Sequence, residues 1–263
     1  HLSLRRQRQM CIRDSMNSFE EKPSAKNIDE LFPNYTPFER AVSYPYSAPD
    51  FSFSFYKGAF VKGIRHDLEN RIPILSVGSN RSPYQLKRKF TLDEDICVTP
   101  AILYDSDIVY AASISAYGSV PATQWPSKGA SVALNVLWLN EDQLNKMHLT
   151  EGLGIAYHFV KLTMGTVKIE DFDYNKDIYG YISVPGVLPF KDKLPRRMSS
   201  IGGNNIKLNE FSEINTLQFL KEIIGEERLQ LDQWLEKIVN DEEYRFSILK
   251  VLGSKVIKPK NPN

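Results

Sequence analysis

The spacing of apolar residues changes once along the chain, from a strand pattern to a helix pattern, which limits the choice of fold class. Short runs rich in Val, Ile, Leu and Tyr, bounded by turn residues, predict strands. These runs cover residues 72–77, 98–104, 108–114, 132–139, 155–163 and 178–184. Beyond Glu210 the apolar residues recur every three or four positions, which predicts helices. The sequence therefore predicts an α+β protein with a helical extension over residues 210–253.

Local signals place turns and two further helices between these strands. Asp-Ser-Asp at 105–107 and Pro-Ser-Lys-Gly at 126–129 are typical of turns. Ser82 and Asn140 are predicted helix N-caps, each with a glutamine three residues later that would complete a capping box. Gly152 is placed to end the second of these helices.

The N-terminal part of the chain has a different character. Residues 1–15, HLSLRRQRQMCIRDS, show no strand or helix period and resemble the read-through translation of a sequencing adapter. We expect them to be non-native and Met16 to be the start. They carry four arginines and one acid, so without them the net charge changes from +1 to a small negative value. Residues 16–70, polar and then rich in aromatics, are predicted to form an irregular arm.

Charge and composition exclude several classes of function. The near-neutral balance argues against a nucleic-acid partner or binding to an anionic membrane, and no apolar run approaches the roughly 20 residues of a membrane span. Cys97 is the only cysteine after residue 15, which fits a reducing cytoplasm. His66, His148 and His158 form no ligand motif such as HExxH, so we expect no metal site.

The first stretch with chemical content is VGSNRSPYQL, residues 77–86, where a predicted strand meets a glycine and then a helix. Gly78 allows the backbone to turn and a ligand to approach it closely. The free N–H groups of Ser79 and Asn80 would face that ligand and form an anion site. The alternative is an ordinary turn that leads into a capped helix.

The second stretch is PATQWPSKGASVALNVLWLNEDQLNKMHLTEG, residues 121–152, and ends on Glu151 and Gly152. A carboxylate at the end of a helix is disfavoured in its ionised form by the helix dipole, which suits a group that transfers protons near neutral pH. The alternative is a solvated glutamate at a helix end. His148 lies one turn earlier and is expected to be a surface histidine.

Taken together, the two stretches resemble the γ-glutamylcyclotransferase-like family, whose YGSN loop and catalytic Glu-Gly they match in order and spacing. The resemblance covers residues 72–162. It implies a small mixed β-barrel or curled sheet with packed helices over residues 71–200. Val77 stands where the family signature usually has tyrosine, which removes a hydroxyl from the expected site.

The resemblance also implies a set of site residues. Glu151 takes the catalytic position, and Tyr157 either lines the pocket or is a strand aromatic. The substrate-binding loop consists of consecutive residues, namely Val77, Gly78, Ser79 and Asn80.

The implied reaction is intramolecular acyl transfer on a γ-glutamyl compound, without a cofactor. The α-amine attacks the γ-carbonyl to give 5-oxoproline and a released amine, while Glu151 moves the protons. The expected partner is a small-molecule substrate, with a homodimer through the C-terminal helices as the candidate assembly. The alternative is a non-catalytic ligand-binding or assembly module on the same fold, and a hydrolase or amine-ligating relative also stays open.

One further stretch, PRRMSSIGGNN at 195–205, has the serines and glycines of a loop that binds phosphate or holds a nucleophile. It contains neither GxSxG nor GxxxxGK[ST], so we expect neither function. Arg196 and Arg197 are expected to be exposed loop residues, the alternative being contact with a substrate carboxylate.

Overall fold

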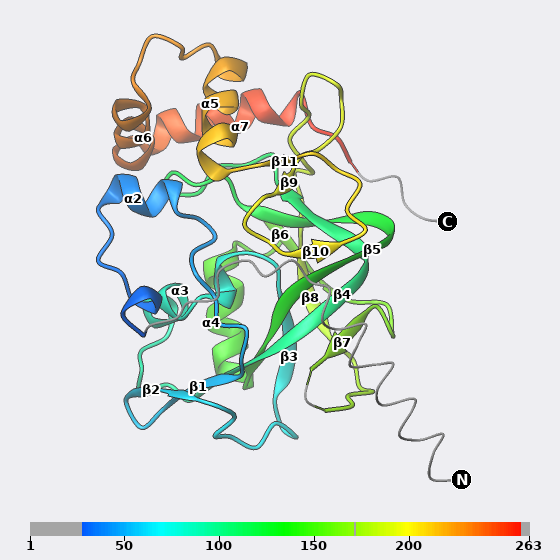
Figure 1. Cartoon of the computed structure of the whole chain (residues 1–263). Helices are drawn as coiled ribbons and strands as arrows, with labels where there is room; N and C mark the ends of the chain where they lie inside the picture. Colours follow the sequence, from blue (N-terminus) through cyan, green and yellow to red (C-terminus); the bar gives the residue numbers. More distant parts are fainter. Residues whose placement is uncertain (1–27, 171, 259–263) are drawn as a thin grey trace.

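Two long antiparallel strands, β4 (Ile96–Tyr110) and β5 (Ala122–Leu139), form the centre of the molecule (Figure 1). The computed structural model describes residues 28–170 and 172–258. The predicted adapter-derived segment, 1–15, lies outside the described residues. Within them, no helix has the length and apolar character needed to cross a membrane.

An 11-stranded mixed sheet grows from both edges of this central pair. Its main path follows the order β11 (Glu210–Phe211), β9 (Arg197–Met198), β4, β5, β3 (Ile72–Ser76), β8 (Tyr179–Ser183) and β6 (Tyr157–Lys161). The side branches are β1 (Phe53–Tyr56) and β7 (Val167–Ile169) on β4, β2 (Ala59–Lys62) on β1, and β10 (Gly203–Asn204) on β5. The α+β prediction is confirmed, and the closed barrel is not: in the described chain the path ends at β6 and β11 without joining them.

Two segments predicted as turns lie inside the central strands instead. The pairing of β4 with β5 shifts register between Tyr104 and Ser106, and Asp105 adopts a positive φ of 54°. Its Oδ1 accepts a hydrogen bond of 2.7 Å from the N–H of Gly129, which belongs to the other predicted turn. Aspartate tolerates this conformation, so the turn-forming residues produce a bulge and the strands continue through it.

The sheet separates two hydrophobic clusters, and alternating residues of β5 point into each of them. Leu137 and Leu139 pack with α3 (Pro83–Lys89) and α4 (Glu141–Glu151), whereas Val136 and Trp138 belong to the larger cluster. This alternation is the period of two that a strand buried on both faces requires. Consequently α3 and α4 are fixed on one face, next to the end of β3.

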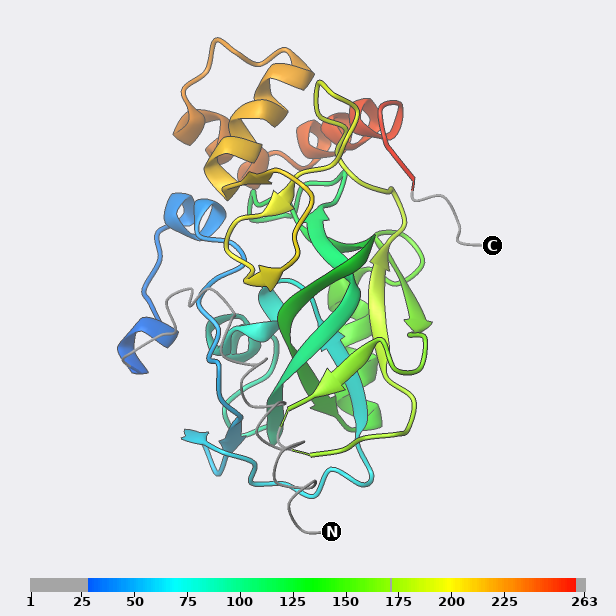
Figure 2. The same cartoon turned by 45° about the vertical axis from the view of Figure 1, so that its right-hand side comes forward.

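The C-terminal helices form as predicted and share the larger cluster with the sheet. They are α5 (Glu213–Ile224), α6 (Leu231–Asn240) and α7 (Glu242–Gly253). Figures 1 and 2 show them grouped at one end of the molecule, with α2 (Pro37–Val42) nearby. Each helix buries side chains in this cluster, among them Leu217, Trp234 and Ile248.

The segment predicted as an irregular arm is more regular than its sequence indicates. It contains the 3₁₀ helix η1 (Ile28–Leu31), α2, and the hairpin of β1 and β2. Thr36 and Glu39 form a complete capping box at the start of α2, which explains how a short helix forms in this polar stretch. The aromatic residues that follow include Tyr44, which is buried and reaches the cavity described below.

The prediction that Arg197 is an exposed loop residue is wrong. Its side chain is 4% exposed and pairs with Asp107 at 3.2 Å and Glu210 at 2.9 Å. Arg197 lies in β9, which pairs with both β4 and β11, so its guanidinium joins three strands. The neighbouring Arg196 is not fully exposed either: its side chain is 12% exposed and pairs with Asp192 at 2.8 Å, and neither residue lines the cavity described below.

Candidate active site

The loop after β3 brings the first motif to the end of the sheet. Val77 and Gly78 follow the last strand residue, and the 3₁₀ helix η2 (Ser79–Arg81) comes next. Gly78 has a φ of −127°, so its absent side chain matters for space and not for a left-handed turn. A Cβ there would collide with the hydroxyl of Tyr44, whose oxygen accepts a 3.0 Å hydrogen bond from Ala122 N–H.

The helix after this loop, α3, starts at the predicted residue but without the predicted capping box. Ser82 is the N-cap, yet its side chain makes no capping hydrogen bond. Within the described chain, Ser82 Oγ and Gln85 Oε1 are both buried without a hydrogen-bond partner. The sequence therefore located the start of the helix correctly and predicted its capping contacts wrongly.

The second motif forms a well-defined helix that ends at the candidate catalytic residue. Asn140 and Gln143 make the predicted capping box at the start of α4, with bonds of 2.8 and 3.0 Å. Gly152 adopts the left-handed conformation that ends the helix, with φ 61°. Glu151 is the last helical residue, and its side chain is 14% exposed, so it is not a solvated glutamate.

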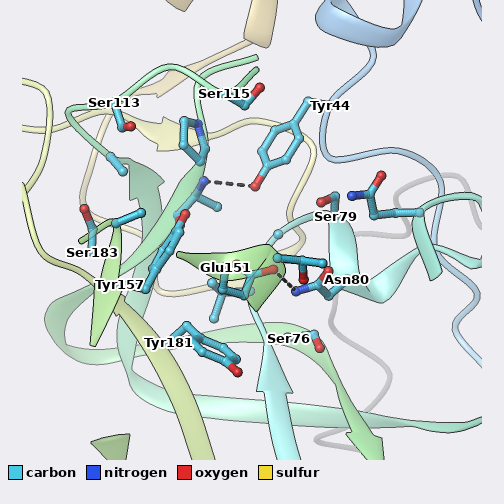
Figure 3. Close-up of a pocket in the computed structure, with 18 of the residues that line it drawn as sticks. Tyr44, Ser76, Ser79, Asn80, Ser113, Ser115, Glu151, Tyr157, Tyr181 and Ser183 are labelled. Atoms are coloured by element: carbon cyan, nitrogen blue, oxygen red, sulfur yellow. Dashed lines mark hydrogen bonds between the residues drawn. The ribbon is translucent and has the colours of Figure 1, made fainter. Parts of the chain in front are cut away.

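Two side chains contact the Glu151 carboxylate, and both contacts fall on the same oxygen. Asn80 Nδ2 donates a 3.1 Å hydrogen bond to Glu151 Oε1 (Figure 3). Lys89 Nζ forms an ion pair with that oxygen, and the lysine side chain is only 10% exposed. The predicted loop and the predicted catalytic helix therefore meet directly.

Lys89 is a site residue that the sequence pattern did not single out. By that pattern its segment is a basic helix with apolar Leu86 and Phe90 facing the core. The available signal was its spacing: Gln85 and Lys89 are four residues apart in α3, share a helix face, and both line the cavity. A helical projection from Pro83 would have placed Lys89 beside Gln85.

All predicted site residues line one cavity of about 270 Å³. They are Val77, Gly78, Ser79, Asn80, Glu151 and Tyr157. Figure 3 shows Asn80 and Glu151 pointing toward each other, with Tyr157 and Tyr181 on the other side of the carboxylate in this view. The volume suits a small organic molecule and is close to the lower end for ligand sites, roughly 300 Å³.

Several polar atoms on the cavity wall have no partner among the described residues. Ser76 Oγ, Asn80 Oδ1 and Gln85 Oε1 are buried and make no hydrogen bond there. A buried polar group left in this state costs about 1–3 kcal/mol, unless water or a ligand bonds to it. The residues that carry these oxygens line the cavity, although the oxygens themselves are buried.

Buried tyrosines supply neutral hydroxyl groups around the carboxylate. Burial raises the pKa of Tyr157 well above its ordinary value, and the nearby Glu151 charge raises it further. Burial, opposed by a hydrogen bond with Ser79, raises the pKa of Tyr117 to about 12. Tyr157 lies in β6 and donates a 3.2 Å hydrogen bond to Ala122 O, so it is both a strand aromatic and a wall of the cavity.

His148 is half-buried, and its ring has a hydrogen-bond partner. Its ring lies edge-on to Phe159 and Tyr181, and its Nδ1 is 2.7 Å from Tyr181 Oη. Burial lowers the pKa of His148, so the imidazole is neutral at pH 7. The cation beside Glu151 is therefore Lys89 and not a protonated histidine.

Comparisons with known proteins add a likeness of fold. No protein-family model matches the sequence, and no curated protein does. Among solved structures, a gamma-glutamyl cyclotransferase matches with 13% identity and a TM-score of 0.35, over 73% of this chain and 90% of its own. The solution structure of At5g39720.1 from Arabidopsis thaliana matches with 17% identity and a TM-score of 0.37, over 62% and 98%.

The uncharacterized protein loc79017 from Homo sapiens matches with 15% identity and a TM-score of 0.35, over 74% of this chain and 92% of its own. The structural neighbours thus include a gamma-glutamyl cyclotransferase. At such low TM-scores and identities the likeness carries no weight for activity, so only the cavity itself bears on function.

Proposed function

We propose that this chain is a γ-glutamylcyclotransferase-like enzyme, with its reactive domain over residues 71–200. The substrate is a γ-glutamyl amine or peptide, and the products are 5-oxoproline and a free amine. One observation carries the proposal: Glu151 and the loop from Val77 to Asn80 line the same cavity and are joined by a hydrogen bond, although about seventy residues separate them.

In the proposed reaction the enzyme folds the substrate and moves protons. The α-nitrogen bonds to the γ-carbonyl carbon, and the amide C–N bond then breaks. Glu151 takes protons from the α-ammonium and returns them to the departing nitrogen, so no external acid or base is consumed. Attack closes a five-membered ring within one molecule, which gives a large proximity advantage.

The cavity wall offers groups for each part of this substrate. The backbone N–H groups of Gly78, Ser79 and Asn80 are candidates to stabilise the negative oxygen that forms on the γ-carbonyl. Asn80 and Gln85 line the cavity, and a turn of either side chain would offer an amide oxygen, without a partner among the described residues, to the donors of an α-ammonium group. Buried, neutral Tyr157 adds a hydroxyl close to Glu151.

Product analysis tests the reaction type. The enzyme is incubated with a γ-glutamyl amide that has a free α-amine and, in parallel, with its N-acetyl analogue. We expect 5-oxoproline and amine from the first and no reaction with the second, because the acetylated nitrogen has lost its basic lone pair. Glutamate as the main product in mass spectrometry would refute cyclotransfer and indicate a hydrolase.

The second candidate function is a non-catalytic binding module, and two observations favour it. The carboxylate of Glu151 is already engaged by Lys89, and Val77 lacks the hydroxyl of the family's signature tyrosine. Such a module would show saturable binding of the γ-glutamyl amide in calorimetry and form neither product. The Glu151→Gln variant would then bind the γ-glutamyl amide, and neither it nor wild type would form a product.

A further inference from the structure

Lys89, the cation beside Glu151, pairs with the Oε1 atom of its carboxylate. We infer that Lys89 is a positioning residue that holds Glu151 through Oε1 and thereby presents Oε2 to the substrate. This inference rests on the proposed function and deepens it, because it names the oxygen that transfers the proton.

Lys89 and Glu151 are the last residues of two helices packed on the same face of the sheet. Lysine is favoured at a helix C-terminus and glutamate is disfavoured there, so pairing the two offsets the unfavourable position of Glu151. Lys89 Nζ also lies 3.4 Å from Met147 Sδ, one turn before Glu151 in α4. The ammonium group is therefore fixed against the catalytic helix at two points.

The contacts are divided unequally between the two carboxylate oxygens, which indicates the oxygen that transfers the proton. Asn80 and Lys89 both contact Oε1, one from η2 and the other from the end of α3. With two donors on one oxygen, rotation of the carboxylate is restricted, and Oε2 is left as the oxygen that can accept from a ligand in the cavity that Glu151 lines. Such preorganisation of a reacting group is a main source of catalytic rate.

The pair also has an energetic consequence. Both side chains are nearly buried, with 10% of Lys89 and 14% of Glu151 exposed. Removing one member of a pair of this kind leaves the other charge uncompensated. A change at Lys89 should therefore act on Glu151, and a change at another lysine of the same helix should not.

The test compares Lys89→Met with Lys87→Ala, an exposed residue of α3 that does not line the cavity. We expect kcat of Lys89→Met to fall about 10- to 100-fold, the size expected for a misplaced catalytic group, with KM within about threefold. Lys87→Ala should behave as wild type. In Lys89→Ala, added propylammonium should restore kcat with saturation, because it supplies the missing cation.

The outcomes separate the inference from the proposed function. Wild-type or higher kcat in Lys89→Met, or no rescue by propylammonium, would overturn the positioning role while 5-oxoproline formation by wild type still supports the function. If wild type forms no 5-oxoproline, the proposed function is refuted. The coupling between Lys89 and Glu151 is then tested by the free energy of unfolding. The losses in stability of Lys89→Met and Glu151→Gln should then sum to more than the loss in the double variant, and additive losses would refute the coupling.

Discussion

Glu151 and Glu213 are two largely buried glutamates at helix ends, and their surroundings differ. Glu151 ends α4, contacts a lysine and an asparagine, and lines a cavity. Glu213 begins α5, is 5% exposed, and accepts a 2.6 Å hydrogen bond from Val120 N–H. Its Oε2 has no partner among the described residues.

The comparison shows that burial alone does not make a carboxylate functional. Burial raises the pKa of Glu213 well above its usual range, and this carboxyl group joins the helical extension to the loop before β5. Glu151 instead has a cation and an open side toward the cavity. We therefore propose proton transfer for the cavity, and packing for the contact of Glu213 in α5 with Val120 before β5, which we call the junction.

The largest expected effect comes from making the same substitution at each of the two glutamates. Glu151→Gln keeps the shape of the side chain and removes its titration, so turnover should fall by about two orders of magnitude or more with ligand affinity mostly kept. Glu213→Gln should leave turnover within a few fold of wild type. Steady-state rates of 5-oxoproline formation measure both, and equal losses would erase the distinction.

The next prediction tests the wall of the cavity. Gly78→Ala places a Cβ against the Tyr44 hydroxyl, so the loop must shift, and we expect weaker ligand binding and a loss of stability of about 1–3 kcal/mol. Tyr44→Phe removes the atom that collides and should recover part of both losses in the double variant. Calorimetric titration and chemical denaturation provide the two readouts. Unchanged affinity in Gly78→Ala would remove this loop from the site.

The third prediction concerns the pH dependence at the junction. The folded pKa of Glu213 lies above the ordinary glutamate value of 4.5, so between these two values the folded state holds a proton that the unfolded state has released. The free energy of unfolding therefore falls as pH rises through this window, by at most about 1.4 kcal/mol per pH unit for one group. Glu213→Gln lacks this contribution and can still accept from Val120 N–H.

Urea denaturation of wild type and Glu213→Gln at pH 5 and pH 8 tests that sign. The variant should gain stability relative to wild type as pH rises. A pH-independent difference would mean that Glu213 is already ionised in the folded protein. Glu213→Leu serves as a contrast to Glu213→Gln, because it leaves the buried N–H of Val120 unsatisfied and should be about 1–3 kcal/mol less stable than Glu213→Gln at both pH values.

Much of the cavity could be predicted from sequence because its key signals are local. The capping box of Asn140 and the left-handed Gly152 fix the ends of α4, so the sequence is sufficient to place Glu151 at a helix C-terminus. The sequence also singles out Gly78 correctly, but the reason for that glycine is contact with Tyr44, a residue of the N-terminal arm. No local pattern could bring that tyrosine to the loop.

The rest depends on long-range pairing that local patterns do not encode. Asp105 was predicted to end a strand, and only the partner strand β5, through Gly129, makes it a bulge. Arg197 was predicted to be exposed, and its burial follows from strands that meet across the sheet. Lys89 was not singled out for the same reason, because its partner Glu151 lies 62 positions away in the sequence.

The smallest expected effect compares the same substitution in the two regions. Ser82 and Ser212 are both N-cap residues, of α3 beside the cavity and of α5 at the junction. Ser212 accepts a 3.2 Å hydrogen bond from Asn215 N–H, whereas Ser82 makes no such bond. Ser212→Ala should therefore cost about 1 kcal/mol of stability, the usual value of an N-cap. Ser82→Ala should change stability by less than about 0.5 kcal/mol, since no cap is lost.

The sign of the Ser82 result is informative about the start of α3. Ser82 Oγ is buried without a partner in the described chain, so removing it also removes a desolvated polar group, and the variant is expected to be neutral or slightly more stable. Chemical denaturation of both variants at one pH is sufficient. A cost of about 1 kcal/mol or more in Ser82→Ala would show that this hydroxyl is bonded in solution, either to helix α3 or to a buried water. The N-cap residues of α3 and α5 would then both be hydrogen-bonded.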